Sequence, residues 1–204
     1  MNDVIAIVDY GMGNLKSVQN ALRAINIPCI ISSNSEEILK SKGIIVPGVG
    51  AFPDAMENLK EQGLDEVIKA GVKKGKPILG ICLGMHLFFE TSEEIRNCEG
   101  LGFFMGTVKR IQGAVKVPHM GWNSLYFEKS CPLLKGVKEE SYVYFVHSYY
   151  AEIGEENIIN AYSMYEKKIP AIISKGNVFG IQFHPEKSGT DGLRILKNFG
   201  ELIK

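Results

Sequence analysis

Hydrophobic and polar residues alternate along the first ninety positions in a way that predicts strands and helices in turn. Short apolar runs, typical of buried strands, are separated by stretches with apolar residues at helical spacing. The predicted strands are Val4–Val8, Pro28–Ile31, Gly43–Val46 and Ile78–Ile81. The predicted helices are Asn14–Ile25, Ser35–Leu39 with Ser35 as its cap, and Pro53–Lys73, which Gly63 can break. Short connections between alternating elements predict a parallel sheet with helices on both faces.

After about Gly100 the pattern changes to short runs typical of a mixed or antiparallel region. The predicted strands there are Thr107–Ile111, Ala114–Val117, Tyr142–Val146, Ile158–Tyr162, Ala171–Ser174 and Val178–Phe183, followed by a closing helix over Thr190–Ile203. The sequence therefore predicts an α/β fold with an open, mixed, mostly parallel sheet flanked by helices, and antiparallel strands in the second half. No repeat or linker interrupts residues 1–204, which we expect to form a single domain.

Composition narrows the functional classes. Of 204 residues, 45% are hydrophobic and 23% charged, and 23 basic residues balance 23 acidic ones, which gives little support for nucleic-acid binding. The apolar run Val4–Val8 is too short for a signal peptide, and no stretch approaches the length of a membrane span. The four cysteines form no CxxC pair, which favours a reducing compartment over a zinc site or disulfide scaffold. We expect a cytoplasmic enzyme or enzyme subunit.

The segment Gly80–Gly84 carries the most informative chemistry. A predicted strand leads into Cys82, which has a glycine two residues away on each side, and a helical-looking segment, Met85–Glu90, follows. This is the pattern of a nucleophile elbow, a sharp strand-to-helix turn that holds a reactive side chain. The glycines let neighbouring backbone approach the turn without Cβ clashes. A helix N-terminus below the sulfur favours the nucleophilic thiolate.

A cysteine nucleophile needs a base and a group that orients it. His184 and Glu186 are the candidates, because alternate residues of an extended segment point to the same side and Pro185 stiffens the spacing. His147 is a rival base, ranked second because no carboxylate adjoins it in the sequence. The remaining histidines are far apart, so we predict no metal site.

A glycine-rich turn, Pro47–Phe52, follows the third predicted strand at the edge of the sheet where ligands bind in open α/β folds. Its backbone N–H groups can face an oxyanion, and the N–H of Leu83, directly after the nucleophile, is a natural second donor. The segment Asp9–Asn14 resembles a dinucleotide loop, but Lys16 occupies the position of the third glycine. We therefore predict neither nucleotide binding nor a cofactor.

Each of these features has a simpler explanation when taken alone. Cys82 can be a core cysteine, His184 a structural histidine, Glu186 a solvated carboxylate and the glycine-rich turn only a tight turn. Their combination in one chain favours catalysis.

These motifs resemble those of the class I glutamine amidotransferases of the triad type. PGVGAF, GICLGMH and FHPE occur in the family's order and spacing over essentially the whole chain. Further segments resemble the glutaminase subunits of imidazole glycerol phosphate synthase. These segments are Asp9–Asn14, Pro118–Asn123, Tyr144–Tyr149 and Gln182–Ser188.

The resemblance implies glutamine hydrolysis through a thioester on Cys82, with His184 and Glu186 completing the triad. Ammonia would pass to a (β/α)8-barrel cyclase in a heterodimer that makes imidazole glycerol phosphate in histidine biosynthesis. The resemblance also assigns further roles by residue. Val49 and Leu83 would donate to the oxyanion, Gly50, His86, His147, Ser148 and Tyr149 would bind glutamine, and Asn14, Trp122 and Tyr144 would lie at the partner interface.

His86 departs from the family, which usually has glutamine at this position. Its different reach and titratable charge predict an altered glutamine affinity or pH optimum. Three alternatives remain open. They are a glutaminase whose cyclase-like partner aminates a surface-sugar precursor, a cysteine hydrolase or protease of similar architecture, and a catalytically silent binding module.

Overall fold

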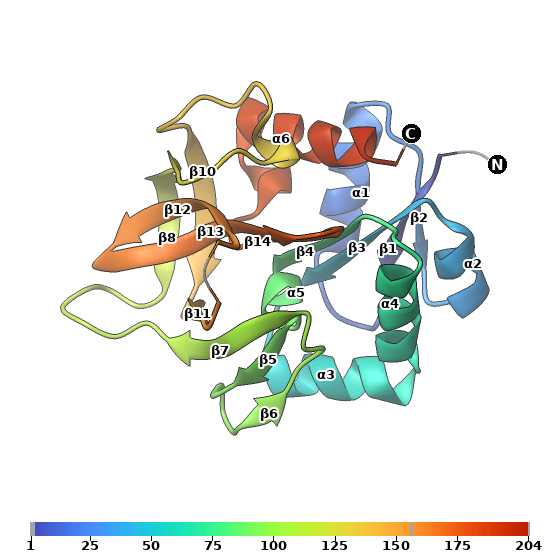
Figure 1. Cartoon of the computed structure of the whole chain (residues 1–204), viewed down its shortest axis with the longest axis horizontal. Helices are drawn as coiled ribbons and strands as arrows, with labels where there is room; N and C mark the ends of the chain where they lie inside the picture. Colours follow the sequence, from blue (N-terminus) through green and yellow to red (C-terminus); the bar gives the residue numbers. More distant parts are fainter. Residues whose placement is uncertain (1–2, 156, 204) are drawn as a thin grey trace.

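A sheet of eight strands runs through the molecule and separates two layers of helices (Figure 1). The computed structural model describes residues 3–155 and 157–203. In spatial order the strands are β2 (Cys29–Ser32), β1 (Ile5–Val8), β3 (Gly43–Gly48), β4 (Ile78–Cys82), β14 (Val178–Ile181), β13 (Lys167–Lys175), β12 (Ile159–Tyr165) and β9 (Tyr126–Phe127). The strands from β2 to β14 are parallel, and β13, β12 and β9 continue the sheet in antiparallel pairing. The predicted mixed, mostly parallel sheet is confirmed.

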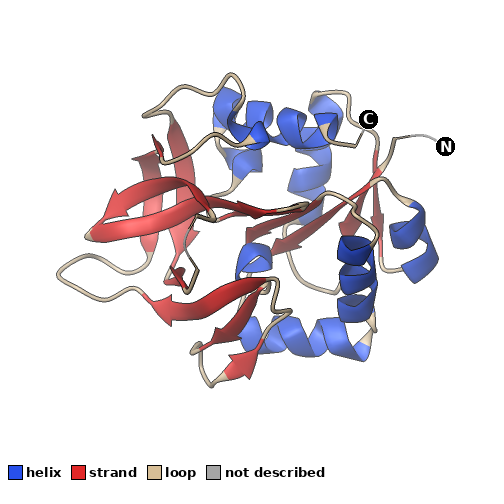
Figure 2. Cartoon of the chain, viewed as in Figure 1, coloured by secondary structure: helices blue, strands red, loops and turns tan. Residues whose placement is uncertain are grey.

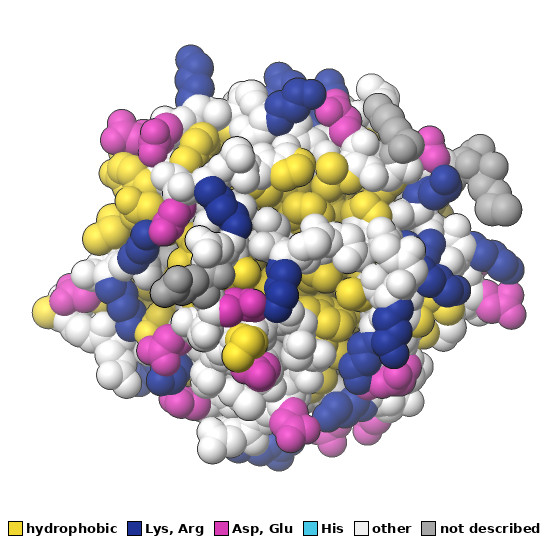
Figure 3. Space-filling model, in the orientation of Figure 1, with side chains coloured by type: hydrophobic (Ala, Val, Ile, Leu, Met, Phe, Trp, Pro, Cys, Tyr) yellow, Lys and Arg dark blue, Asp and Glu magenta, His cyan; other side chains and the backbone are white. Residues whose placement is uncertain are grey.

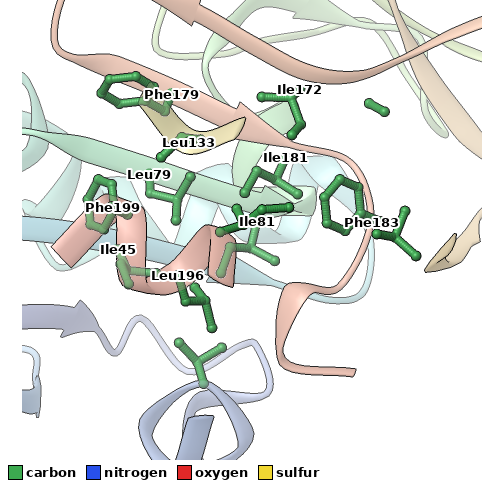
Figure 4. Close-up of a cluster of buried hydrophobic side chains, with 14 of the residues drawn as sticks. Ile45, Leu79, Ile81, Leu133, Ile172, Phe179, Ile181, Phe183, Leu196 and Phe199 are labelled. Carbon is green, nitrogen blue, oxygen red and sulfur yellow. The ribbon is translucent and has the colours of Figure 1, made fainter. Parts of the chain in front are cut away.

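Alternate side chains of the central strands pack into two separate hydrophobic cores, one on each face of the sheet. Ile5 and Ile7 of β1 pack in one hydrophobic cluster, whereas Ala6 and Val8 pack in the other, because successive side chains of a strand point to opposite faces. Leu196 and Phe199 belong to the first cluster (Figure 4). The larger helices are α1 (Leu15–Ala24), α2 (Ser35–Lys40), α3 (Phe52–Glu61), α4 (Leu64–Lys73) and α6 (Gly189–Glu201). Helices α1 and α6 cover one face of the sheet, and α3 and α4 cover the other.

Two smaller sheets pack around the large one, one beside its antiparallel strands and the other extending toward α3 (Figure 2). One pairs β8 (His119–Ser124) with β10 (Tyr142–His147). The other contains β11 (Tyr149–Ile153), β7 (Phe104–Arg110), β5 (Phe89–Ser92) and β6 (Cys98–Glu99). A short 3₁₀ helix, η1 (Pro132–Leu134), connects β9 to β10. Of the described residues, no helix is long and apolar enough to cross a membrane. Basic and acidic side chains are interspersed over the face in Figure 3.

Three local predictions are wrong. The segment 114–117 is a loop, and its alternating pattern arises because Val115 and Val117 pack against a small cluster around Ile111 without pairing as a strand. The helix after Cys82, α5 (Leu83–His86), ends well before residue 90, and the chain then enters β5. The cap of α2 is Asn34 rather than Ser35, because the Asn34 side chain accepts hydrogen bonds from two backbone N–H groups of the first turn.

The carboxyl ends of β3 and β4 lie side by side, with Gly48 paired to Cys82. Cys82 has φ 54° and ψ −111° and is both the last residue of β4 and the first flanking residue of α5. A positive φ is a strained conformation for a residue with a side chain, and such strain clusters at functional sites. The predicted strand-to-helix elbow is therefore confirmed.

The glycines around the elbow allow α5 to fold back onto the sheet. A Cβ at Gly84 would lie 1.8 Å from the Val46 carbonyl oxygen, and one at Gly80 would lie 2.6 Å from the Gly84 carbonyl oxygen. Both distances are far below van der Waals contact. Backbone is thus packed directly on backbone beneath Cys82, which leaves the sulfur at the sheet edge.

Gly84→Ala should destabilise the protein by about 3 kcal/mol or more, because the added methyl group overlaps backbone that cannot rotate away. Thermal unfolding should show this as a decrease in Tm of roughly 6–12 °C. The matched control is Gly75→Ala, where φ is +74° and nothing lies within 4 Å of the added Cβ. It should cost only the left-handed backbone penalty of about 1–2 kcal/mol. Equal effects of the two substitutions would contradict this account of the elbow.

Candidate active site

The chain that follows β14 brings a histidine and a carboxylate beside the elbow. Ile181 pairs with Ile81, so the residues after β14 continue alongside Cys82. His184 Nδ1 lies 2.9 Å from Glu186 Oε1, and the two side chains are only 3% and 1% exposed. The backbone that achieves this is not the extended segment that the sequence predicts. Residues Pro185–Lys187 form a 3₁₀ helix, η2, which turns the carboxylate back toward the imidazole.

Ser188 fixes this turn to the neighbouring sheet. Its hydroxyl donates to the His184 carbonyl oxygen at 2.6 Å and accepts from the Tyr144 N–H at 3.0 Å. The His184 N–H in turn donates to the Tyr144 carbonyl at 2.9 Å. The backbone of His184 is therefore held by β10. The sequence analysis included Ser188 in a family-like segment but predicted no role for it, because that role depends on contacts with β10 that only the fold creates.

Electrostatics favour a proton on His184. Burial opposes its charge, but hydrogen bonds to Cys82 and Glu186 and attraction to their negative charges together raise the pKa of the imidazole to about 9. The charged form therefore dominates at neutral pH. Because the folded-state pKa exceeds the ordinary value of about 6.5, this charge stabilises the fold below pH 6.5. The contribution is lost as the pH rises through about 9.

One cavity of about 390 Å³ joins most of the predicted residues. Its lining comprises Val49, Gly50, Cys82, Leu83, His86, Glu94, Pro118, Val146, His147, Ser148, Tyr149 and His184. Every residue predicted as nucleophile, base, oxyanion donor or glutamine contact is in this set. Glu186 is not in the lining and is in contact with His184 instead. Asn14, Trp122 and Tyr144, predicted for the partner interface, are also outside the lining.

Glu94 is the one acidic side chain in the lining, and the sequence prediction did not include it. Its Oε2 accepts a hydrogen bond from the Phe52 N–H at 3.0 Å. Phe52 begins α3, so the carboxylate acts as a cap for that helix and ties it to the pocket. Burial raises the pKa of Glu94, and the bond from Phe52 opposes this increase. No local pattern identifies such a residue, because its partner is 42 positions away.

His86 lies in the wall of the cavity, is 3% exposed and contacts the side chain of Gln182. Its Nε2 lies 2.7 Å from Gln182 Oε1. Burial lowers the pKa of His86 to about 4, against a smaller opposing effect of the bond to Gln182. The imidazole is therefore neutral around pH 7. The altered glutamine affinity or pH optimum expected from this residue stays a prediction.

The rival base, His147, has both ring nitrogens engaged. Nδ1 donates to the Tyr149 carbonyl oxygen at 2.7 Å, so Nε2 accepts from His119 Nδ1 at 3.0 Å. His119 stacks on Phe145 with ring centroids 4.6 Å apart, and its Nε2 lies 3.2 Å from Asn123 Nδ2. Burial lowers the pKa of His147 to about 3 and that of His119 to about 4. These contacts disfavour proton transfer by His147.

A hydrogen bond from Tyr10 fixes the start of the glycine-rich turn. The Tyr10 hydroxyl donates to the Pro47 carbonyl oxygen at 2.7 Å, and burial raises the pKa of this phenol. A Cβ at Gly13 would lie 3.3 Å from that carbonyl, so the loop that ends at Asn14 packs against the turn. Val49 itself is 44% exposed. Gly13, which precedes the predicted interface residue Asn14, thus packs against the start of the turn that contains Val49.

The β8–β10 sheet carries an exposed apolar platform, which we define as Met120, Trp122, Tyr142 and Tyr144. Tyr144 pairs with Trp122 across the strands, and their rings meet edge to face at 6.0 Å. Met120, Trp122 and Tyr142 are 59%, 55% and 60% exposed. Val146, one pair further along the same face, lines the cavity. The platform therefore extends to the mouth of the site.

The fold and the cavity define an α/β enzyme with a cysteine at a strand-to-helix elbow. The family model for class I glutamine amidotransferases matches residues 6–202. The chain belongs to this family, as its motifs predicted. Membership favours the amidotransferase prediction over the hydrolase or protease alternative. Within residues 3–155 and 157–203, no group of three or more side chains is arranged to hold a metal ion.

Several curated relatives match nearly the full length of the chain. "Imidazole glycerol phosphate synthase subunit HisH" of Bacillus cereus (strain B4264) is 52% identical, over 98% of this chain and 96% of the relative. The protein of the same name from Oceanobacillus iheyensis is 53% identical, over 98% and 100% of the two chains. Two solved structures share the fold. A glutamine amidotransferase crystal structure has a TM-score of 0.77 at 20% identity, covering 99% of each chain. PurLQS from Thermotoga maritima has 0.80 at 18%, covering 100% of each.

The histidines should titrate in two well-separated groups in an NMR pH titration of the ring Cε1–H signals. His184 should change near pH 9, whereas His86, His119 and His147 should stay neutral from pH 6 to 8. Glu186→Gln should lower the midpoint of the His184 titration, because it removes the adjacent negative charge. A His184→Asn variant identifies the signal. A His184 midpoint near 6.5 in the unmodified protein would contradict the ion-pair description.

Proposed function

We propose that the chain is the glutaminase subunit of an imidazole glycerol phosphate synthase. It hydrolyses glutamine and supplies ammonia to a cyclase subunit in histidine biosynthesis. The observation that carries this proposal is the pairing of Cys82 with a buried histidine–carboxylate couple at one cavity, in a chain about half identical over its full length to subunits of that synthase.

Catalysis follows from the proposed roles of Cys82, His184 and Glu186. The sulfur attacks the side-chain carbonyl carbon of glutamine, and His184 gives its proton to the departing ammonia, which leaves a thioester on Cys82. A water molecule that passes a proton back to His184 then attacks the thioester and releases glutamate. Glu186 holds the imidazole through Nδ1 and stabilises its charged form. This chemistry needs no cofactor.

The backbone N–H groups of Val49 and Leu83 are proposed to stabilise the oxyanion of the tetrahedral intermediates. Both residues line the cavity beside Cys82. The predicted glutamine contacts, namely Gly50, His86 and the segment 147–149, line it as well. We add Glu94, whose carboxylate is suited to the α-ammonium group of glutamine because it is the acidic side chain of the lining.

The apolar platform is proposed to dock a (β/α)8-barrel cyclase in a heterodimer, with Asn14 at the edge of the interface. Exposed tryptophan and tyrosine side chains are typical centres of protein interfaces. Residues 1–204 would act as one domain, in a reducing cytoplasmic setting that keeps the thiol of Cys82 available. The synthase as a whole would also have a lyase activity, which belongs to the assembled enzyme rather than to this subunit.

Cys82→Ser should abolish glutaminase activity, because the less acidic hydroxyl is a poor nucleophile at this position. In the complex with the cyclase, synthesis from added ammonium salt should persist at the unmodified rate. The measurement compares glutamate release with product formation from glutamine and from ammonia. Retained glutaminase activity would exclude Cys82 as the nucleophile. Loss of the ammonia-dependent reaction would mean that the chain does more than supply ammonia.

Trp122→Ala should weaken binding of the cyclase subunit by roughly 30-fold or more, as expected for a central aromatic side chain. Isothermal titration with the purified cyclase measures the Kd. Met105→Ala is the matched control, because Met105 is 50% exposed but belongs to β7, outside the platform. An equal effect of both substitutions would contradict the proposed interface. Binding only to a cyclase-like partner of sugar amination would support the alternative acceptor instead.

A further inference from the structure

Cys82, which precedes helix α5, and His86, its last residue, lie at the same cavity. The helix begins directly after Cys82 and contains only four residues, Leu83–His86. At its end, His86 Nε2 lies 2.7 Å from Gln182 Oε1. The exposed fractions are 3% for His86 and 0% for Gln182, so this contact is shielded from water. A buried hydrogen bond of this length fixes the orientation of both side chains.

The other end of the same amide faces the nucleophile. Gln182 follows β14, which pairs in register with β4, and its Nε2 lies 4.0 Å from Cys82 Sγ. One buried amide group therefore spans from His86 to the sulfur. At this distance the contact with a neutral thiol is weak, but it strengthens when the sulfur carries negative charge.

When the sulfur is a thiolate, only one direction of donors and acceptors fits this chain of contacts. A carbonyl oxygen only accepts, so His86 Nε2 must carry the ring proton that Gln182 Oε1 accepts. With Oε1 held by His86, the NH₂ group of Gln182 is directed at Cys82. If the amide were reversed, an oxygen would face the sulfur and repel a thiolate.

We propose that His86 is a positioning residue, which locks the Gln182 amide with its N–H toward Cys82 and so stabilises the thiolate. This inference rests on the proposed nucleophilic role of Cys82. Hydrogen bonding to the charged form of a group favours that form. The mechanism needs no charge on His86, only its fixed tautomer.

Other titratable groups also surround the sulfur and the relay, and the test must separate their effects. They are Tyr10 two residues after β1, His184 and Glu186 after β14, and His147 and Glu94 at the cavity. All five side chains are kept when His86 or Gln182 is replaced, but loss of His86 removes a positive charge that helps to lower the pKa of His147, whereas loss of Gln182 does not.

The pH dependence of Cys82 alkylation by iodoacetamide tests the proposal on the full chain. Mass spectrometry of the Cys82 peptide distinguishes this thiol from Cys29, Cys98 and Cys131. His86→Leu fills similar space but cannot donate a hydrogen bond, so the midpoint of the alkylation profile should rise by about one pH unit. Below the midpoint this corresponds to roughly tenfold slower alkylation. Gln182→Leu should produce the same shift.

His86→Gln is the conservative variant, because its amide can donate to Gln182 Oε1. Its midpoint should stay within about 0.3 pH units of the unmodified protein, a rate difference of about twofold. The double variant His86→Leu/Gln182→Leu should shift no further than either single variant, because both act through one contact. Circular dichroism and thermal unfolding verify that each variant is folded.

An unchanged midpoint in folded His86→Leu would overturn the proposal. A shift in His86→Leu without one in Gln182→Leu would also overturn it, because the effect would then bypass the amide. Alkylation requires no turnover of glutamine. A negative result here therefore leaves the proposed glutaminase function to be judged by its own assay.

Discussion

The close contact of backbone with backbone at Gly84 and Val46 is the constraint on which the site depends. Without a side chain at Gly84, α5 can begin at the very edge of the sheet and turn sharply over β3. The turn then holds Cys82 in a strained conformation with a positive φ of 54°. The strain is local, and the two hydrophobic cores on either side of the sheet supply the stability that maintains it.

Four segments that are far apart in the sequence meet at this edge. The turn after β3, the elbow after β4 and the η2 segment after β14 come from adjacent parallel strands, as ligand sites of open α/β sheets generally do. The fourth, the end of β10, comes from a separate small sheet. Ser188 joins that sheet to the base, since its hydroxyl binds both His184 and Tyr144. Ser188, which fixes the backbone of His184, thus also contacts Tyr144 of the exposed platform.

The first half of the fold could be predicted closely because its strands are continuous apolar runs and its helices have regular spacing. The elbow was predictable for a similar reason, since two glycines flanking a cysteine have few other structural explanations. Residues 114–117 show where the hydrophobic pattern fails to predict a strand. Their alternation reflects the burial of every second side chain, which a loop can also achieve without pairing with a neighbouring strand. Glu94, Ser188 and the Gln182 contact could not be predicted, because each acts through a partner that only the folded chain brings near.

His86, His119 and His147, which lie in or behind the cavity wall, are neutral at pH 7, and this affects the stability of the whole protein. In the unfolded chain each would bind a proton near pH 6.5, whereas the folded interior delays protonation until about pH 3–4. Acidification across that interval therefore draws protons toward the unfolded state and progressively lowers the free energy of unfolding. The burial that keeps His86, His119 and His147 neutral thus reduces the stability of the fold as the pH falls below about 6.5.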